Sequence, residues 1–458
     1  FMLQGRFQLQ RIQAVVIDGI SRTHHLYMLQ PGYGLHKLHL DVCRQRGGHA
    51  LDIHLIGIQP FRLNEQLMPF CAPEEGKNAF IVTCMDYVST EDGTGIVHIA
   101  PAFGEDDSRV GKKYNLPFVQ YVDGKGEMTK ETPWAGMFVK DADPVILEDL
   151  RSRGALFSAP QFEHSYPFCW RCDTPLIYYA TDSWFIKMTA VRDDLVRNNN
   201  TVNWIPEGIG RGRFGSWLEN VQDWGISRNR YWGTPLPIWR SEDGTEELCI
   251  GSIAELIKEI DKAVAAGVMK DNPYKNFRVG DFSKDNYAPE NIDLHRPFVD
   301  NILLVSPTGQ VMKRETDLID VWFDSGAMPY AQIHYPFETG QTPLDEVKGL
   351  LTADFISEGV DQTRGWFYTL HAIHTMIDGS VAFRNVISNG LVLDKNGSKM
   401  SKRLGNAVDP FATIEQYGSD PLRWYMLTNS SPWDNLKFDA DGVAEVSRKF
   451  FGTPYNTY

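Results

Sequence analysis

Two short apolar runs and one helix pattern between residues 350 and 393 restrict the fold more than any other feature of this chain. The first run ends at Phe355 and Ile356, and strand character returns at residues 386–387 and 391–393. Between them, apolar residues recur at helical spacing along one face: Trp366, Phe367, Leu370, Ile373, Met376 and Ile377. A strand, a crossover helix and a second strand make a βαβ unit, so we predict an α/β fold with a parallel sheet.

The loops that follow these two strands form the predicted binding region. Ligands of doubly wound sheets bind beyond the carboxyl ends of the strands, so residues 357–364 and 394–403 should face one crevice. Capping and periodicity also predict three helices elsewhere, from Asp143 to Gly154, over residues 252–269, and from Ser419 through Leu427.

The loop at residues 394–403 carries Lys399 and Lys402 close to Gly397 and Gly405. Two ammonium groups on a glycine-flanked loop are suited to neutralising the charge that builds on a departing pyrophosphate. The same residues also fit a solvated basic hairpin turn, because Asn-Gly is a common turn signal. The residues alone leave both interpretations open.

The turn at residues 358–367 places Glu358, Asp361 and Gln362 beside Trp366. Carboxylates in such a turn are suited to holding an ammonium and a ribose hydroxyl. Trp366 and Trp322 would then wall a slot for a branched aliphatic side chain. The alternatives are an acidic cluster at a helix N-terminus and tryptophans that fill the core.

Two pairs of residues point to hydrolysis and to metal binding. His98 ends a predicted strand and Asp107 follows nine residues later, a pair that can orient a water, although a single strand histidine is more often structural. Cys169 and Cys172 form one Cys-Xaa-Xaa-Cys motif, which is half of a tetrahedral zinc site.

Four arginines, Arg211, Arg213, Arg228 and Arg230, form a basic stretch with aromatic residues between them. They either contact RNA or line a surface. The net charge of −14 argues against coating of nucleic acid by bulk charge, so any RNA contact must be local.

Composition narrows the class of protein. A chain of 458 residues usually forms two or three domains, and its 6 cysteines are too few for a disulfide scaffold. No stretch approaches the roughly 20 apolar residues of a membrane span, and no secretory signal pattern is visible, so we expect a cytoplasmic protein. Residues 1–70 hold half of the 12 histidines and show no clean periodicity, so we interpret them as an atypical segment foreign to the fold.

Residues 399–403, Lys-Met-Ser-Lys-Arg, closely resemble the KMSKS signature of class I aminoacyl-tRNA synthetases, with Arg403 in place of the final serine. Residues 358–367 resemble the isoleucyl members of that family, and residues 224–233 and 320–326 match the same family. Residues 93–107 resemble the editing domain of isoleucyl, valyl and leucyl enzymes. The resemblance covers about residues 71–458.

The resemblance implies roles for individual residues. Lys399, Ser401 and Lys402 would be catalytic in adenylation, and Lys402 and Met400 would contact ATP. Six residues would contact the aminoacyl-adenylate: Glu358, Gly359, Asp361, Gln362, Trp322 and Trp366. The editing pocket would include His98 and Asp107, and a structural zinc ion would bind Cys169 and Cys172.

The resemblance also implies an order of domains. A mixed α/β editing domain (partial) would occupy residues 71–165, and connective strands with an insertion would occupy 166–318. The second half of a Rossmann-like nucleotide fold would span 319–405, and a stem-contact region with the start of a helical anticodon-binding domain would span 406–458. The sequence contains no His-Ile-Gly-His signature, so we expect a central fragment that is inactive in adenylation by itself.

The implied function of the parent protein is ATP-dependent attachment of isoleucine to tRNA-Ile, with Mg²⁺ accompanying ATP and with hydrolytic removal of mischarged valine. The parent enzyme would be a monomer with no membrane partner. Two other functions stay open: a stand-alone deacylase of mischarged tRNA and a noncatalytic tRNA-binding fragment.

Overall fold

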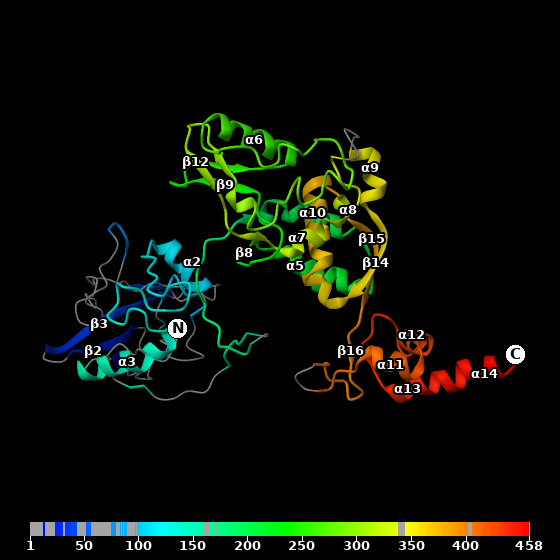
Figure 1. Cartoon of the computed structure of the whole chain (residues 1–458). Helices are drawn as coiled ribbons and strands as arrows, with labels where there is room; N and C mark the ends of the chain where they lie inside the picture. Colours follow the sequence, from blue (N-terminus) through cyan, green and yellow to red (C-terminus); the bar gives the residue numbers. More distant parts are fainter. Residues whose placement is uncertain are drawn as a thin grey trace. The chain divides into compact units, whose positions relative to one another are not determined.

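The computed structural model describes residues 75–78, 83, 85, 87–88, 97, 99–154, 156, 158–159, 165–169, 172–337, 344–401 and 405–457. Four earlier strands and residues 344, 345 and 348 are described by their backbone alone. The chain divides into two units, residues 1–182 and residues 183–458 (Figure 1), and each is described by itself.

The first unit begins with a four-stranded antiparallel sheet. Its strands lie in sequence order: β1 (Ile12–Gln13), β2 (Thr23–Gln30), β3 (Tyr33–Cys43) and β4 (Asp52–Leu55). We predicted no regular element there, although Leu38, Leu40 and Val42 alternate with polar residues along β3. The interpretation of residues 1–70 as foreign to the fold stays a prediction.

Two described helices follow in the same unit, α2 (Glu105–Tyr114) and α3 (Val139–Ser152). The predicted start of α3 at Asp143 is wrong, since the helix begins four residues earlier and contains Pro144 in its interior. The buried face of α3 explains the difference, because Val139 and Ala142 continue the apolar stripe of Ile146 toward the N-terminus. The predicted end is close to the observed one.

The second unit is built around a three-stranded parallel sheet with the order β14-β15-β6. Its strands are β6 (Asn203–Ile205), β14 (Ala353–Gly359) and β15 (Phe383–Asn389), and the helix α10 (Trp366–Asp378) connects β14 to β15. The predicted βαβ unit is therefore confirmed. Its core is made of large buried side chains from the sheet, from α10, from the helix α4 (Arg192–Asn199), from the π-helix η3 (Ile209–Phe214) and from α5 (Gly215–Glu219): Leu195, Trp204, Phe214, Leu218, Phe367, Leu370, Phe383 and Val386.

Short elements connect to this sheet. They are η2 (Met188–Val191), the π-helix η3 (Ile209–Phe214), α5 (Gly215–Glu219), α7 (Val321–Gly326), α8 (Met328–Ala331), α9 (Leu344–Leu351) and the 3₁₀ helix η5 (Val360–Arg364). Two antiparallel pairs join β5 (Phe185–Ile186) to β7 (Trp224–Gly225) and β8 (Ser227–Arg228) to β13 (Leu318–Ile319). A Cβ on Gly326 would lie 2.8 Å from the backbone oxygen of Thr369, so glycine permits the close approach of α7 to α10.

An antiparallel subdomain at residues 236–318 has its own core. Its sheet has the order β10-β9-β12-β11, with β9 (Ile238–Ser241), β10 (Glu247–Cys249), β11 (Leu303–Val305) and β12 (Val311–Arg314). The helix α6 (Ile253–Ala265) covers this core with Leu256 and Ile260, next to η4 (Val299–Asn301). The helix predicted over 252–269 is confirmed, although it ends at Ala265. Ser252 caps it by accepting the N–H of Glu255 at 3.1 Å.

After β15 the chain leaves the parallel sheet. The strand β16 (Val392–Leu393) pairs in parallel with β17 (Leu436–Lys437), so the predicted strand character at 391–393 belongs to a separate ladder. Helices follow at α11 (Pro410–Tyr417), α12 (Ser419–Thr428), α13 (Ala440–Glu445), η6 (Val446–Phe451) and α14 (Gly452–Thr457). The helix predicted at Ser419 is confirmed, although Gly418 rather than Ser419 is its capping residue. None of the helices described in either unit is long and apolar enough to span a bilayer.

Candidate functional site

The carboxyl end of β14 carries four of the residues predicted to hold an aminoacyl-adenylate. Gln362 accepts the backbone N–H of Trp366 at 2.9 Å and donates to the Asp361 carboxylate at 3.2 Å. A Cβ on Gly359 would lie 2.5 Å from Asp361 Oδ1, so a larger residue there would displace this carboxylate from the strand end. Glu358 is exposed one residue earlier. This turn, residues 358–367, is called the polar turn below, and it brings two carboxylates and one amide to the end of β14.

Trp322 and Trp366 lie on either side of Gly365. Trp366 Nε1 donates to the backbone oxygen of Ser325 at 3.1 Å, which ties the start of α10 to α7. A Cβ on Gly365 would lie 3.0 Å from Trp322 Cη2 and 2.7 Å from Gln362 Oε1. Trp322 is 41% exposed and therefore does not fill the core. The structure thus brings both predicted tryptophans to the polar turn.

Asp320 organises the start of α7 and was not singled out from the sequence. Its side chain is 5% exposed, forms an ion pair with Arg228 at 2.7 Å, and accepts Trp224 Nε1–H at 3.1 Å. It also caps α7 by accepting the N–H of Trp322. The buried carboxylate of Asp320, which binds one guanidinium and two N–H groups, thus fixes the start of α7 and with it the position of Trp322.

The four arginines of the basic stretch have different environments. Arg228 is held by Asp320 and also donates to the backbone oxygens of Gly225 and Ser227. Arg211 forms an ion pair with Glu207 at 2.5 Å. Two of the four charges are thus already compensated within the protein.

The loop after β16 is held by two polar side chains. Asp394 accepts the backbone N–H groups of Asn396 at 2.9 Å and Ser398 at 2.8 Å, and the amide of Asn406 at 2.9 Å. These hydrogen bonds hold the pKa of the Asp394 carboxyl below its usual range, and the bond from Asn406 has the largest effect. Asn406 also accepts the N–H of Ser401 at 2.8 Å. Sequence reasoning missed Asn406, although the Asp-Xaa-Asn-Gly string is a turn signal for Asp394.

Within this loop Lys399 is exposed, and Met400 packs against the apolar cluster around Tyr425. A Cβ on Gly397 would lie 3.2 Å from Lys437 Cε, so β17 brings a further ammonium to the loop that the sequence did not indicate. Lys402 lies outside the described residues. The loop thus presents positive charge from two segments.

Asp107, predicted for editing, lies in the first turn of α2. One of its oxygens accepts the backbone N–H of Ala100 at 3.0 Å, and the other accepts the hydroxyl of Tyr87 at 3.5 Å. Burial, together with the charge of Asp107, raises the pKa of Tyr87. His98 lies outside the described residues, so the expected pairing of His98 and Asp107 stays a prediction.

Cys169 and Cys172 both contact Thr174. The N–H of Cys169 donates to the backbone oxygen of Thr174 at 2.8 Å, and Cys172 Sγ lies 3.1 Å from Thr174 Oγ1. Hydrogen bonding from Thr174, and then from Cys169, lowers the pKa of the Cys172 thiol. Among the described residues no three His, Cys, Asp or Glu side chains gather as metal ligands. These residues supply two of the four ligands that zinc requires, so they do not support the predicted zinc site.

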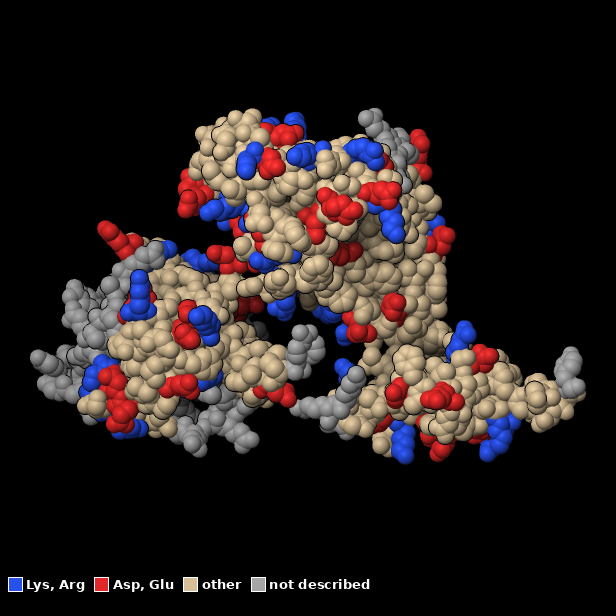
Figure 2. All heavy atoms as spheres, in the orientation of Figure 1, with Lys and Arg blue, Asp and Glu red and all other residues tan. Residues whose placement is uncertain are grey.

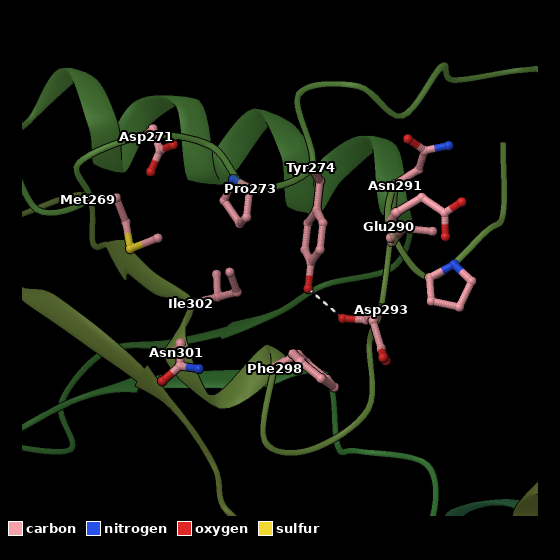
Figure 3. Close-up of a pocket in the computed structure, with 12 residues that line it drawn as sticks. Met269, Asp271, Pro273, Tyr274, Glu290, Asn291, Asp293, Phe298, Asn301 and Ile302 are labelled. Atoms are coloured by element: carbon pink, nitrogen blue, oxygen red, sulfur yellow. Dashed lines mark hydrogen bonds between the residues drawn. The ribbon is translucent and has the colours of Figure 1, made fainter.

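A cavity of about 370 Å³ lies in the antiparallel subdomain (Figure 3). The hydroxyl of Tyr274 donates to the backbone oxygen of Asp293 at 2.7 Å at its centre, and Met269, Phe298 and Ile302 form apolar walls. None of the residues that the sequence singled out for chemistry lines it. The cavity is therefore separate from the polar turn and from the loop at residues 394–403, which is called the lysine loop below.

Comparison with known proteins places these features in a family context. Residues 88–439 match the family model described as tRNA synthetases class I (I, L, M and V). An isoleucine–tRNA ligase of Porphyromonas gingivalis is 56% identical over 433 residues, which cover 86% of this chain and 38% of that protein. An isoleucine–tRNA ligase of Bacteroides fragilis is 56% identical over 435 residues, with the same coverage. The chain thus spans about 38% of the length of these curated relatives.

Among solved structures, Mycobacterium tuberculosis methionyl-tRNA synthetase in complex with methionyl-adenylate is 16% identical to this chain, with a TM-score of 0.38. The match covers 64% of this chain and 42% of the other.

Proposed function

Because this chain belongs to the class I tRNA synthetases of the isoleucine, leucine, methionine and valine group, we propose that it forms part of an isoleucine–tRNA ligase. The observation that carries the proposal is the 56% identity to isoleucine–tRNA ligases over 86% of this chain. The segment that matches the family model, residues 88–439, includes the polar turn and the lysine loop. The reaction proposed for the whole enzyme is activation of isoleucine by ATP with Mg²⁺, followed by transfer to tRNA-Ile. We further propose a cytoplasmic enzyme that acts as a monomer.

In this proposal the lysine loop serves the activation step. Lys399 and Lys402 neutralise the negative charge that grows on pyrophosphate as it leaves. Ser401 and Met400 position the loop against ATP. The hydrogen bonds between Asn406 and the loop support this role, because catalysis by positioned charge needs a fixed geometry.

The polar turn serves the amino acid. The exposed carboxylate of Glu358 and that of Asp361 hold the ammonium and ribose groups of the adenylate, while Gln362 fixes the start of α10. Trp322 and Trp366 provide apolar surface for a branched aliphatic side chain. One methylene is worth only about 1–3 kcal/mol in such a slot, a range already established for isoleucine against valine in enzymes of this kind.

Limited discrimination in the slot motivates a second, hydrolytic site. We assign it to residues 71–165, with His98 and Asp107 in the deacylation pocket. The order of the remaining parts is proposed as connective strands and insertion at 166–318, half of the nucleotide fold at 319–405, and a stem-contact region at 406–458. A zinc ion on Cys169 and Cys172 would need two further ligands from outside the described residues.

The test uses a chimeric enzyme in which residues 88–439 of this chain replace the matching segment of the Porphyromonas gingivalis ligase. We expect ATP–pyrophosphate exchange stimulated by isoleucine more than by valine or leucine. Lys399→Ala should reduce the exchange rate by about 100-fold, the scale seen when one transition-state charge contact is removed. Lys395→Ala, a change of an exposed lysine in the same loop, is the matched control. Exchange that responds equally to all three amino acids would contradict the proposal.

A further inference from the structure

Arg213 contacts Thr363, which lies 150 residues further along the chain and immediately precedes Arg364. Arg213, on the π-helix η3, donates from Nε to Thr363 Oγ1 at 2.8 Å. The guanidinium of Arg364 stacks 3.9 Å from the ring centre of Trp217. We propose that these two arginines form a binding site for the phosphodiester backbone of RNA. The inference rests on the proposed function, because that function supplies tRNA as the partner.

The charge of this pair is not compensated within the part of the chain that the structure describes. Neither guanidinium forms an ion pair with a described carboxylate there, in contrast to Arg211 with Glu207 and Arg228 with Asp320. Desolvation, and then the charge of Arg213, lowers the pKa of Arg364. The two guanidinium groups repel each other, and an anion that bridges them would remove this repulsion and bind favourably to both.

The geometry of Arg364 favours a phosphate as that anion. Stacking uses the face of the guanidinium, so the five N–H donors in its plane stay available for bidentate contact with phosphate oxygens. Trp217 is itself held in an edge-to-face contact with Tyr368 of α10, with ring centres 6.2 Å apart. The guanidinium is therefore positioned before a ligand arrives, which lowers the entropy cost of binding.

The location favours RNA over a small anion. Thr363 belongs to η5, the turn that follows the carboxyl end of β14 and also carries Asp361 and Gln362. A tRNA end that receives an amino acid from this turn must pass beside it, so its backbone needs sequence-independent contacts there. Acidic and basic side chains are interspersed over the face of the molecule in Figure 2, which fits a local contact rather than a broad basic surface.

The experiment measures binding of a fluorescently labelled tRNA-Ile transcript to the whole 458-residue chain by anisotropy between 50 and 300 mM KCl. For the double variant Arg213→Gln/Arg364→Gln we expect the slope of log K against log salt to lose about 0.7–0.9 per phosphate contact removed. Affinity at 100 mM KCl should fall by about tenfold or more. Arg364→Lys should retain part of the slope, because the charge stays and the planar fork is lost.

The matched control is Arg211→Gln, on the same π-helix but paired with Glu207, and it should leave the slope unchanged. Thermal melting of each variant checks that it is folded. An unchanged slope in a folded double variant, or no RNA binding by the wild-type chain, would overturn the site. A raised KM for ATP in the chimera with an unchanged RNA slope would also overturn it. Isoleucine-dependent exchange needs no RNA, so it tests the proposed function separately.

Discussion

Asn406 and Asp394 close the loop that carries Lys399. The Asn406 amide donates to the Asp394 carboxylate at 2.9 Å and to the backbone oxygen of Lys399 at 3.2 Å, and its oxygen accepts the N–H of Ser401 at 2.8 Å. One side chain thus joins the start and the end of the loop. Since a lysine can stabilise leaving charge only when its backbone is fixed, Asn406 is a positioning residue in the proposed reaction.

We therefore predict that Asn406→Ala lowers kcat for isoleucine-dependent exchange in the chimera by about tenfold, the effect of losing about 1.4 kcal/mol of positioning. The KM for isoleucine should stay near the wild-type value, because the polar turn is untouched. Asn396→Ala removes an exposed amide from the same loop and should have little effect. An equal loss in both variants would show that the loop tolerates no change at all and would refute a specific role of Asn406.

A second prediction concerns Asp320. Asp320→Ala removes the partner of Arg228, the acceptor of Trp224 Nε1 and the cap of α7. We expect the free energy of unfolding of the chain to fall by about 2–3 kcal/mol, because a buried carboxylate with three partners is lost. Urea unfolding followed by tryptophan fluorescence measures this change. Asp317→Ala, three residues earlier, is the control and should cost less than about 0.5 kcal/mol.

Local patterns were sufficient for the elements that bury one continuous face. The stripe from Trp366 to Ile377 predicted α10, and Ser252 with its apolar repeat predicted α6. The start of α3 was missed, because the Asp143–Pro144 signal is typical of a helix start while burial of Val139 extends the helix further. A local signal thus loses to tertiary packing where the two disagree.

The candidate site was predicted as a set of residues and not as a set of contacts. The turn and the lysine loop were visible because glycine, acidic and basic residues cluster in sequence. The ion pair between Arg228 and Asp320 spans 92 residues, and the contact of Arg213 with Thr363 spans 150. Such pairs depend on the crossover connections of the sheet, which no window of local sequence contains.

A third prediction concerns pH. His371 is fully buried on α10, and this burial is the main reason why its pKa falls to about 4. The hydrogen bond to the backbone oxygen of Leu195 raises the pKa, whereas the neighbouring His374 lowers it further. Because the folded pKa lies below the ordinary value of about 6.5, the folded state disfavours protonation. The contribution of neutral His371 to the free energy of unfolding is therefore fully present above pH 6.5. It is lost as the pH falls toward 4, which lowers the free energy of unfolding by about 3 kcal/mol in all.

Urea midpoints at pH 7.5, 6.0 and 5.0 test this dependence. His371→Phe should be less stable at pH 7.5, since the backbone oxygen of Leu195 loses its partner, but its midpoint should change less with pH. His295→Gln replaces an exposed histidine and should keep the wild-type dependence. A His371→Phe variant that loses as much stability on acidification as the wild type would assign the effect to other groups.

The last prediction concerns the π-helix that carries Arg213. A Cβ on Gly210 would overlap the indole ring of Trp204, whose Nε1 is fixed by a bond to Asn199 at 2.8 Å, whereas a Cβ on Gly212 meets nothing within 4 Å. Gly210→Ala should therefore reduce the free energy of unfolding by about 1–3 kcal/mol through overpacking. Gly212→Ala should be neutral or stabilise the chain by about 0.5 kcal/mol, because alanine loses less conformational entropy.

Urea unfolding of the two variants separates a steric effect from a general sensitivity of the segment. Equal destabilisation by both changes would mean that the π-helix, rather than the contact with Trp204, limits what the segment accepts. The same pair also tests the link to RNA. Trp204 lies on β6 and Arg213 follows Gly210 by three residues on η3, so displacing η3 from the sheet moves Arg213 away from Thr363. A folded Gly210→Ala variant should then show a reduced salt slope for tRNA, while Gly212→Ala keeps it.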